Sequence, residues 1–156
     1  MNKISVIIDN SGSMSCMSKI DIIKTVCRNL LLQENFDFDF YEWSDALEKI
    51  NFETYGVINI SDKKTKIQSL VDFIKSNSDA KILILTDGFI EGDASELTSL
   101  IKKSELLKVK IVGIGADCSY TSCKKLFPAS YLVTAATKPI FTTLEIDAAL
   151  DSFLEY

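Results

Sequence analysis

Carboxylate and hydroxyl side chains follow two apolar segments of this sequence, at the points where those segments end. The segment KISVIID, residues 3–9, ends in Asp9, and Ser11 and Ser13 follow at alternate positions. The segment KILILT, residues 81–86, is followed directly by Asp87. Carboxylate and hydroxyl oxygens are hard donors that suit Mg²⁺ or Mn²⁺ and are poor ligands for zinc. These residue types therefore point to a site for a hard divalent cation.

The elements around these residues must bring them together. Both apolar segments have the composition of buried strands, and segments with helical spacing of apolar residues separate the strands along the chain. Strands interleaved with helices predict an α/β fold, a doubly wound and mostly parallel sheet with helices on both faces. The carboxyl ends of adjacent parallel strands meet at one edge of such a sheet, where ligands bind. We therefore expect Asp9 and Asp87 to lie close together, with a cation between them to relieve their repulsion.

The remaining elements follow from the same periodicities. Residues 46–60 are expected to form a short edge hairpin, and a capping box of Thr142 and Glu145 is expected to begin the last helix. Further strands are predicted at 36–43, 109–115 and near 130–134, and helices over 18–32, from Thr65 onward, through 97–107, near 121–127 and over 143–154. The sequence shows no linker or repeat, so residues 1–156 are predicted to form a single domain.

Composition excludes several classes of function. The net charge of −5, with no cluster of Lys and Arg, argues against nucleic-acid binding. The absence of histidine excludes a Ser-His-Asp catalytic triad. No apolar run approaches the roughly 20 residues of a membrane span, and no leader-like segment precedes the first strand, so no membrane association and a cytoplasmic location are expected. The four cysteines are predicted to be reduced, with a Cys118–Cys123 redox pair as the alternative.

Two motifs carry a resemblance to a known family. The run DNSGSM, residues 9–14, fits the pattern D-x-S-x-S after a first strand, and LTDG, residues 85–88, fits a later aspartate turn. Together they resemble the metal-ion-dependent adhesion site (MIDAS) of von Willebrand factor type A (vWA) domains. The segments YEWSD, 41–45, and VGIGADC, 112–118, are similar to other strand ends of that family, so the likeness extends over essentially the whole chain. The resemblance implies a Rossmann-like fold and a metal site formed by Asp9, Ser11, Ser13, Thr65 and Asp87.

Thr65 departs from the family pattern in its surroundings. The family usually places two glycines before this threonine, whereas this chain has Lys63 and Lys64. Thr65 also begins the run TKIQ, in which a threonine at the helix start and a glutamine three residues later form a capping box. Metal ligation and helix capping both remain open for Thr65.

The resemblance implies a protein-binding adaptor and no enzyme activity. Two carboxylates and neutral hydroxyls around Mg²⁺ or Mn²⁺ leave at least one position for water. A partner protein with an Asp or Glu side chain would take that position. Intracellular relatives of this kind serve multiprotein systems built around AAA+ ATPases or kinase–phosphatase pairs, and the residues do not favour one of these systems.

Four alternatives remain at the level of sequence. The run DNSGSM is also a typical polar turn before a helix. A metal-dependent phosphoryl hydrolase of the haloacid dehalogenase type would need an aspartate where this chain has Ser11, and its lysine motif is missing. A flavodoxin-like protein would bind phosphate or FMN at the loop of residues 10–15, although nearby carboxylates disfavour an anion. The fourth alternative is a vWA-like fold whose metal site is vestigial.

Overall fold

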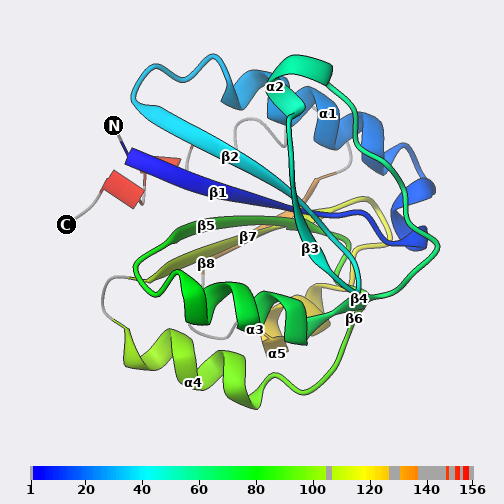
Figure 1. Ribbon diagram of the computed structural model, residues 1–156. Coiled ribbons are helices and arrows are strands. Elements are labelled where there is room, and N and C mark those ends of the chain that lie inside the picture. Colours follow the sequence, from blue (N-terminus) through cyan, green and yellow to red (C-terminus); the bar gives the residue numbers. More distant parts are fainter. Residues whose placement is uncertain are drawn as a thin grey trace.

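A six-stranded sheet forms the centre of the computed structural model, which describes residues 2–104, 107–126, 131–136, 147, 150, 151, 153 and 154 (Figure 1). In the described part of the chain the strand order is β3-β2-β1-β5-β7-β8. Only β2 and β3 pair antiparallel, and the other neighbouring strands pair parallel. The strands are β1 (Asn2–Asp9), β2 (Phe36–Trp43), β3 (Leu47–Ile50), β5 (Lys81–Thr86), β7 (Lys108–Ile114) and β8 (Tyr131–Ala136). The predicted α/β fold class is confirmed.

Helices cover both faces of this sheet. In Figure 1, α1 and α2 lie against one face, and α3, α4 and α5 lie against the other. The helices are α1 (Lys19–Leu30), α2 (Phe52–Tyr55), α3 (Ile67–Ser76), α4 (Ser95–Lys103) and α5 (Tyr120–Leu126), and a 3-10 turn, η1, covers Gly12–Ser15. Two short parallel strands, β4 (Thr65–Lys66) and β6 (Ile90–Glu91), join the loops before α3 and α4.

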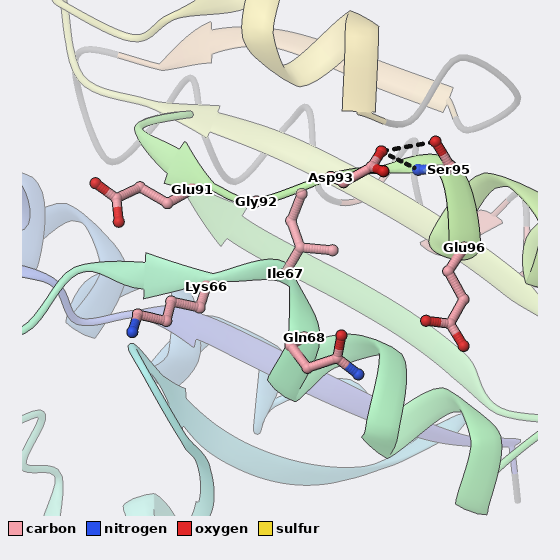
Figure 2. A pocket seen from close by; sticks show the side chains of 8 residues that line it. All are labelled: Lys66, Ile67, Gln68, Glu91, Gly92, Asp93, Ser95 and Glu96. Atoms are coloured by element: carbon pink, nitrogen blue, oxygen red, sulfur yellow. Dashed lines mark hydrogen bonds between the residues drawn. The ribbon is translucent and has the colours of Figure 1, made fainter.

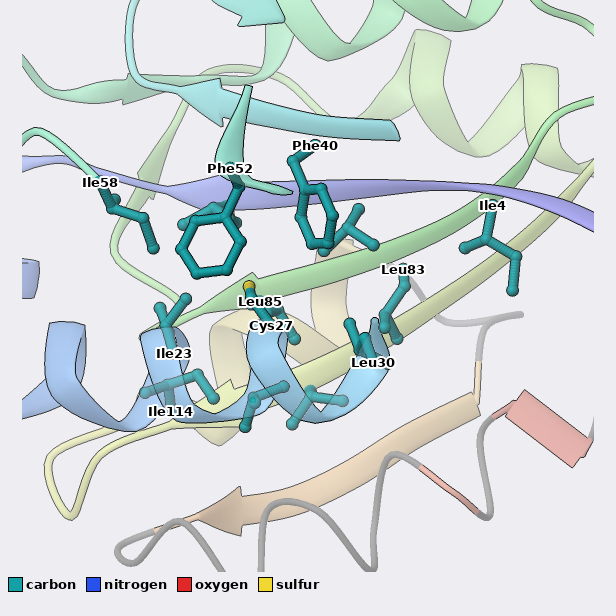
Figure 3. Packing of buried hydrophobic residues seen from close by; sticks show 14 of the residues in the cluster. Ile4, Ile23, Cys27, Leu30, Phe40, Phe52, Ile58, Leu83, Leu85 and Ile114 are labelled. Carbon is teal, nitrogen blue, oxygen red and sulfur yellow. The ribbon is translucent and has the colours of Figure 1, made fainter. Parts of the chain in front are cut away.

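Side chains along the central strands alternate between two hydrophobic cores. On β5, Leu83 and Leu85 belong to the core beneath α1 and α2, and Ile82 and Ile84 belong to the core beneath α3 and α4. Figure 3 shows the first of these cores, where Leu83 and Leu85 lie near Ile23, Cys27 and other residues of α1. Because successive side chains of a strand point to opposite faces, a strand covered on both faces favours apolar residues at successive positions, as in residues 82–85 of β5.

The chain leaves β1 toward β2 on one side and later returns to β5 on the other. Neighbouring strands β1 and β5 therefore enclose the topological switch point of the sheet. Residues Ile4–Ile8 of β1 pair in register with Lys81–Leu85 of β5. This register places Asp9 beside Thr86 at the carboxyl ends of the two strands.

Three predicted segments differ in detail. An edge hairpin was expected within 46–60, but only Leu47–Ile50 forms a strand there, β3, which pairs antiparallel with β2. Residues 52–55 form the helical turn α2 instead, where the Asn51 side chain accepts a hydrogen bond from the Thr54 N–H. The helix expected through Leu107 ends at Lys103, and Leu107 lies just before β7. The predicted start of the last helix, at Thr142 and Glu145, lies outside the described residues, as does most of that helix.

The four cysteines are free thiols. In the described part of the chain, no helix has both the length and the apolar character needed to cross a membrane.

Candidate metal centre

The Asp9 carboxylate lies at the centre of the candidate site and is fully buried. Its Oδ1 atom accepts hydrogen bonds from the Ser11 hydroxyl at 2.7 Å, the Ser11 N–H at 3.0 Å and the Thr65 hydroxyl at 2.7 Å. Its Oδ2 atom accepts a hydrogen bond from the Thr86 hydroxyl at 2.6 Å. Four donors from three segments of the chain therefore hold this carboxylate in one orientation.

Ser11 and Ser13 reach the site because the chain turns into η1 directly after β1. The two hydroxyl oxygens lie 3.2 Å apart. The turn closes through a hydrogen bond from the Met14 N–H to the Ser11 carbonyl, and the buried Met14 side chain packs into the first core. The alternating D-x-S-x-S spacing thus brings both serine hydroxyls to the end of β1.

Thr65 belongs to the site and does not cap α3. The structure places Lys66 at the N-cap position, with no side-chain hydrogen bond to the helix. Gln68, the expected partner of Thr65 in a capping box, bonds to Asp72 instead. The capping-box prediction was therefore wrong. Because β4 pairs with β6, the backbone at Thr65 is extended, and its buried hydroxyl donates to Asp9.

Asp87 enters the site with a different partner. Its Oδ2 atom accepts a hydrogen bond from the Lys19 ammonium at 3.0 Å, and its Oδ1 atom accepts one from the Phe89 N–H at 3.3 Å. The same ammonium donates to the Ser13 carbonyl at 3.1 Å. Asp9, Ser11, Ser13 and Thr65 therefore join through direct hydrogen bonds between their side chains, and Asp87 is linked to them through Lys19.

The alternation of the sheet explains why the two aspartates have different partners. Asp9 follows Ile7 by two positions and shares its direction, toward the face covered by α3. Asp87 follows Leu85 by two positions and shares its direction, toward the face covered by α1. Asp9 consequently meets Thr65 at the start of α3, and Asp87 meets Lys19 at the start of α1.

For both Asp9 and Lys19, burial and hydrogen bonding shift the pKa in opposite directions. Burial raises the pKa of the Asp9 carboxyl group, although the hydroxyls of Thr86, Thr65 and Ser11 favour its ionised form. Burial by itself would lower the pKa of Lys19, but the carboxylates of Asp117 and Asp87 outweigh it and raise that pKa. Lys19 is therefore a charged ammonium in the interior of the protein.

The oxygen donors present fit a hard divalent cation. Ser11 and Thr65 direct their hydroxyl protons to Asp9, which leaves oxygen lone pairs of both residues available. Neighbouring ligands of an octahedral Mg²⁺ ion lie about 3 Å apart, close to the 3.2 Å between the hydroxyls of Ser11 and Ser13. Among the described residues, no group of three or more His, Cys, Asp or Glu side chains is placed to hold a metal ion, so such a site would depend on the hydroxyls.

A cavity of about 540 Å³ opens beside these hydroxyls. Ser11, Ser13 and Phe89 line it, together with Lys63 and Lys64. Both lysines are exposed and ion-paired within the chain, with Asp45 and Glu91 respectively. The Phe89 side chain is half exposed. A ligand at the serine hydroxyls would therefore meet an aromatic ring and two basic side chains at the rim.

A second hollow, of about 560 Å³, lies between the first turns of α3 and α4 (Figure 2). Figure 2 shows Asp93 accepting hydrogen bonds from Ser95, at 2.9 Å from the N–H and 2.6 Å from the hydroxyl. Glu96 forms an ion pair with Lys75. Because these acidic side chains have partners within the chain, the cavity at Ser11 and Ser13 is the better candidate for a ligand site.

Lys19 is the site residue that the sequence reasoning did not identify. Its signal is its helical position: Lys19 lies three and four residues before Ile22 and Ile23, at the beginning of the buried stripe of α1. A lysine on a buried stripe requires an anionic partner. That rule predicts an ion pair for Lys19, although it does not say which carboxylate supplies it.

Comparisons with known proteins bear on the fold. No protein-family model matches the sequence, and no curated protein matches it either. BatB from Bacteroides thetaiotaomicron, a conserved hypothetical protein, superimposes with a TM-score of 0.79 at 12% identity, over 100% of both chains. A von Willebrand factor type A protein from Catenulispora acidiphila gives a TM-score of 0.70 at 17% identity, covering 97% of this chain and 42% of that one.

A third structure that resembles the chain is a single domain of similar length. The VWA domain of SpRpn10 gives a TM-score of 0.61 at 13% identity, covering 95% of both chains. The three superpositions cover between 95% and 100% of this chain. The chain therefore has the fold of a von Willebrand factor type A domain.

Proposed function

We propose that the protein is a metal-dependent adaptor that captures an acidic side chain of a partner protein. The ligands of the metal would be Asp9, Ser11, Ser13, Thr65 and Asp87. The observation that carries the proposal is the convergence of three hydroxyls, from Ser11, Ser13 and Thr65, around one buried carboxylate at the switch point of the sheet. The vWA fold supports it at a coarser level, since this fold is typical of protein-interaction modules.

The hydrogen bonds of Asp9 support a site for a cation. The hydroxyls of Ser11, Thr65 and Thr86 donate their protons to Asp9, so the lone pairs of their oxygen atoms point away from this carboxylate. A bound Mg²⁺ or Mn²⁺ would supply an electrophilic centre with an exchangeable water. Asp87 would add a second carboxylate to the ligand set, although its oxygens already accept hydrogen bonds from Lys19 and the Phe89 N–H.

The proposed partner is a protein that presents an Asp or Glu side chain. The cavity beside Ser13 has room for such a side chain, and Lys63 and Lys64 lie at its rim. A component of an intracellular multiprotein system, such as an AAA+ ATPase or a kinase–phosphatase pair, is the kind of partner we propose, in the cytoplasm. The proposal assigns no catalytic step to the protein.

Titration with Mn²⁺ tests the metal site. Electron paramagnetic resonance of free Mn²⁺ measures the dissociation constant for wild type and for Ser13→Ala, which removes one proposed ligand. We expect Ser13→Ala to weaken binding about tenfold or more. Ser15→Ala is the matched control: its hydroxyl lies in the same turn but bonds to the Gly12 carbonyl, so its affinity should equal wild type. Equal affinities in all three proteins would contradict the proposal.

Water proton relaxation then tests the open coordination position. Water bound to protein-held Mn²⁺ enhances relaxation, and a carboxylate that replaces this water reduces the enhancement. We expect a short peptide containing Glu to reduce it, and the same peptide with Gln to leave it unchanged. The Glu peptide is added up to concentrations at which a simple carboxylate would saturate protein-held Mn²⁺. If it has no effect on the relaxation there, the metal site does not capture acidic side chains.

A further inference from the structure

Lys19 lies beside the candidate metal site as a fully buried cation. Its side chain is 0% exposed, and so is that of Asp87. The ammonium lies 3.0 Å from Asp87 Oδ2 and 2.8 Å from Asp117 Oδ1, and it donates to the Ser13 carbonyl at 3.1 Å. The Lys19 ammonium therefore contacts the side chain of one proposed metal ligand, Asp87, and the backbone carbonyl of another, Ser13.

Two features make lysine an unfavourable residue at this position unless its charge is used. Lys19 is the first residue of α1, where the positive end of the helix dipole repels a cation. Its complete burial also removes the ammonium from water, which is costly unless carboxylates surround it. The helix dipole and the burial both disfavour a lysine here, and the carboxylates of Asp87 and Asp117 offset both effects.

The surrounding structure is shaped to hold this side chain. Gly115 has φ +93°, and a Cβ atom there would lie 2.7 Å from Lys19 Cε, so a larger residue at this position would displace the lysine side chain. The Phe89 ring covers the ammonium from another side, with 6.0 Å between Nζ and the ring centroid. Residues from α1, from the loop after β5 and from the loop after β7 thus form one compartment for the cation.

We infer that Lys19 is an internal cation that competes with a divalent metal ion for Asp87 and so sets the metal affinity of the site. The inference rests on the proposed metal-binding function. With Lys19 present, two carboxylates, Asp87 and Asp117, contact one fixed positive charge, and Asp87 is partly neutralised before any metal binds. Lys19 consequently weakens metal binding. Asp117 reduces this effect, because it shares the ammonium and draws it away from Asp87.

Lys19→Met tests the competition. Methionine keeps much of the volume and removes the charge, leaving Asp87 without its cationic partner. Mn²⁺ binding is measured by electron paramagnetic resonance, and folding is checked by circular dichroism and thermal unfolding. We expect Lys19→Met to bind Mn²⁺ at least tenfold more tightly than wild type. We also expect its melting temperature to rise more with added Mn²⁺ than that of wild type, because tighter binding adds more stability.

Asp117→Asn provides a prediction of opposite sign. The Asp117 side chain is 41% exposed, so asparagine can replace it without burying a new group. Lys19 would then have Asp87 as its only carboxylate partner, and we expect Mn²⁺ affinity to fall at least threefold. Lys24→Met, which removes the same charge farther along α1, is the control and should leave the affinity unchanged.

The two variants separate competition from a structural role. A lysine that merely fastens α1 to the sheet would give lower stability in both variants, with no increase in affinity in either. A folded Lys19→Met protein with unchanged or weaker Mn²⁺ affinity therefore overturns the inference. If Lys19→Met does not fold, Asp117→Asn decides: a weaker affinity supports the inference, and an unchanged or tighter affinity overturns it.

Failure of the proposed function has a different signature. Mn²⁺ binding by Lys19→Met but not by wild type would support the competition and show that the natural protein does not use the metal. Binding by wild type with no change in Lys19→Met would leave the proposed function intact and remove the inference. No Mn²⁺ binding by any of the proteins would overturn both.

Discussion

At the scale of single residues, two threonines share the Asp9 carboxylate but differ in what else they contact. The Thr65 hydroxyl bonds to Oδ1, the same atom that Ser11 contacts. The Thr86 hydroxyl bonds to Oδ2 and accepts a hydrogen bond from the Gly88 N–H. Both hydroxyls orient Asp9, but only Thr65 lies on the side of the serine hydroxyls.

Thr65→Val and Thr86→Val form a matched pair that tests whether Thr65 is a ligand. Each variant removes one hydroxyl donor from a buried carboxylate, so each should lower the free energy of unfolding by about 1–3 kcal/mol, measured with urea. Only Thr65→Val should also weaken Mn²⁺ binding, by about tenfold. Unchanged Mn²⁺ affinity in Thr65→Val would limit Thr65 to the orientation of Asp9.

At the scale of elements, the turn after β5 positions Asp87 and depends on Gly88. This residue has φ +86°, and a Cβ atom there would lie 2.7 Å from the Ser119 carbonyl oxygen and 2.9 Å from Cys123 Sγ. The turn therefore passes directly against the N-terminal end of α5, which fixes the position of the Asp87 backbone relative to β7.

Gly88→Ala and Gly56→Ala separate the two costs of a side chain at a positive φ. Gly56 has φ +61° with nothing within 4 Å of the added Cβ, so Gly56→Ala should cost only backbone strain, about 1–2 kcal/mol. Gly88→Ala adds steric overlap with backbone and should cost about 3 kcal/mol or more. Urea unfolding midpoints measure both costs, and equal destabilisation would show that the chain near Ser119 yields without penalty.

At the scale of the whole molecule, β5 is covered on both faces, and two cores meet across it. Ile84 and Leu85 are adjacent and fully buried, and they belong to different cores. The edge strand β3 differs, because its Ile50 is only partly buried against the first core. Stability should therefore depend on both layers of helices to a similar degree.

Ile84→Ala and Leu85→Ala test this dependence. Each removes a large buried side chain, so each should lower the free energy of unfolding by about 2–5 kcal/mol. Ile50→Ala should cost less, since part of that side chain already contacts solvent. Urea unfolding gives all three values, and a cost below about 1 kcal/mol for either β5 variant would mean that its face of the sheet is loosely covered.

Much of this architecture was predictable from local sequence. Apolar runs such as ILIL, residues 82–85, and the helical spacing on α1 and α3 predicted the elements of a doubly wound fold, because burial on both faces favours apolar residues at successive positions of a strand. The D-x-S-x-S spacing predicted that Asp9, Ser11 and Ser13 would lie together, because a tight turn after a strand keeps alternate residues close.

The tertiary structure decided the partners of the polar side chains. Thr65 had both a local and a distant role open to it, and the pairing of β4 with β6 made its hydroxyl a donor to Asp9. Lys19 and Asp87 are 68 positions apart, and Lys19 and Asp117 are 98 apart. Periodicity reports which side chains are buried, but the charge that meets a buried lysine depends on which distant loops the packed sheet and helices bring to the same edge.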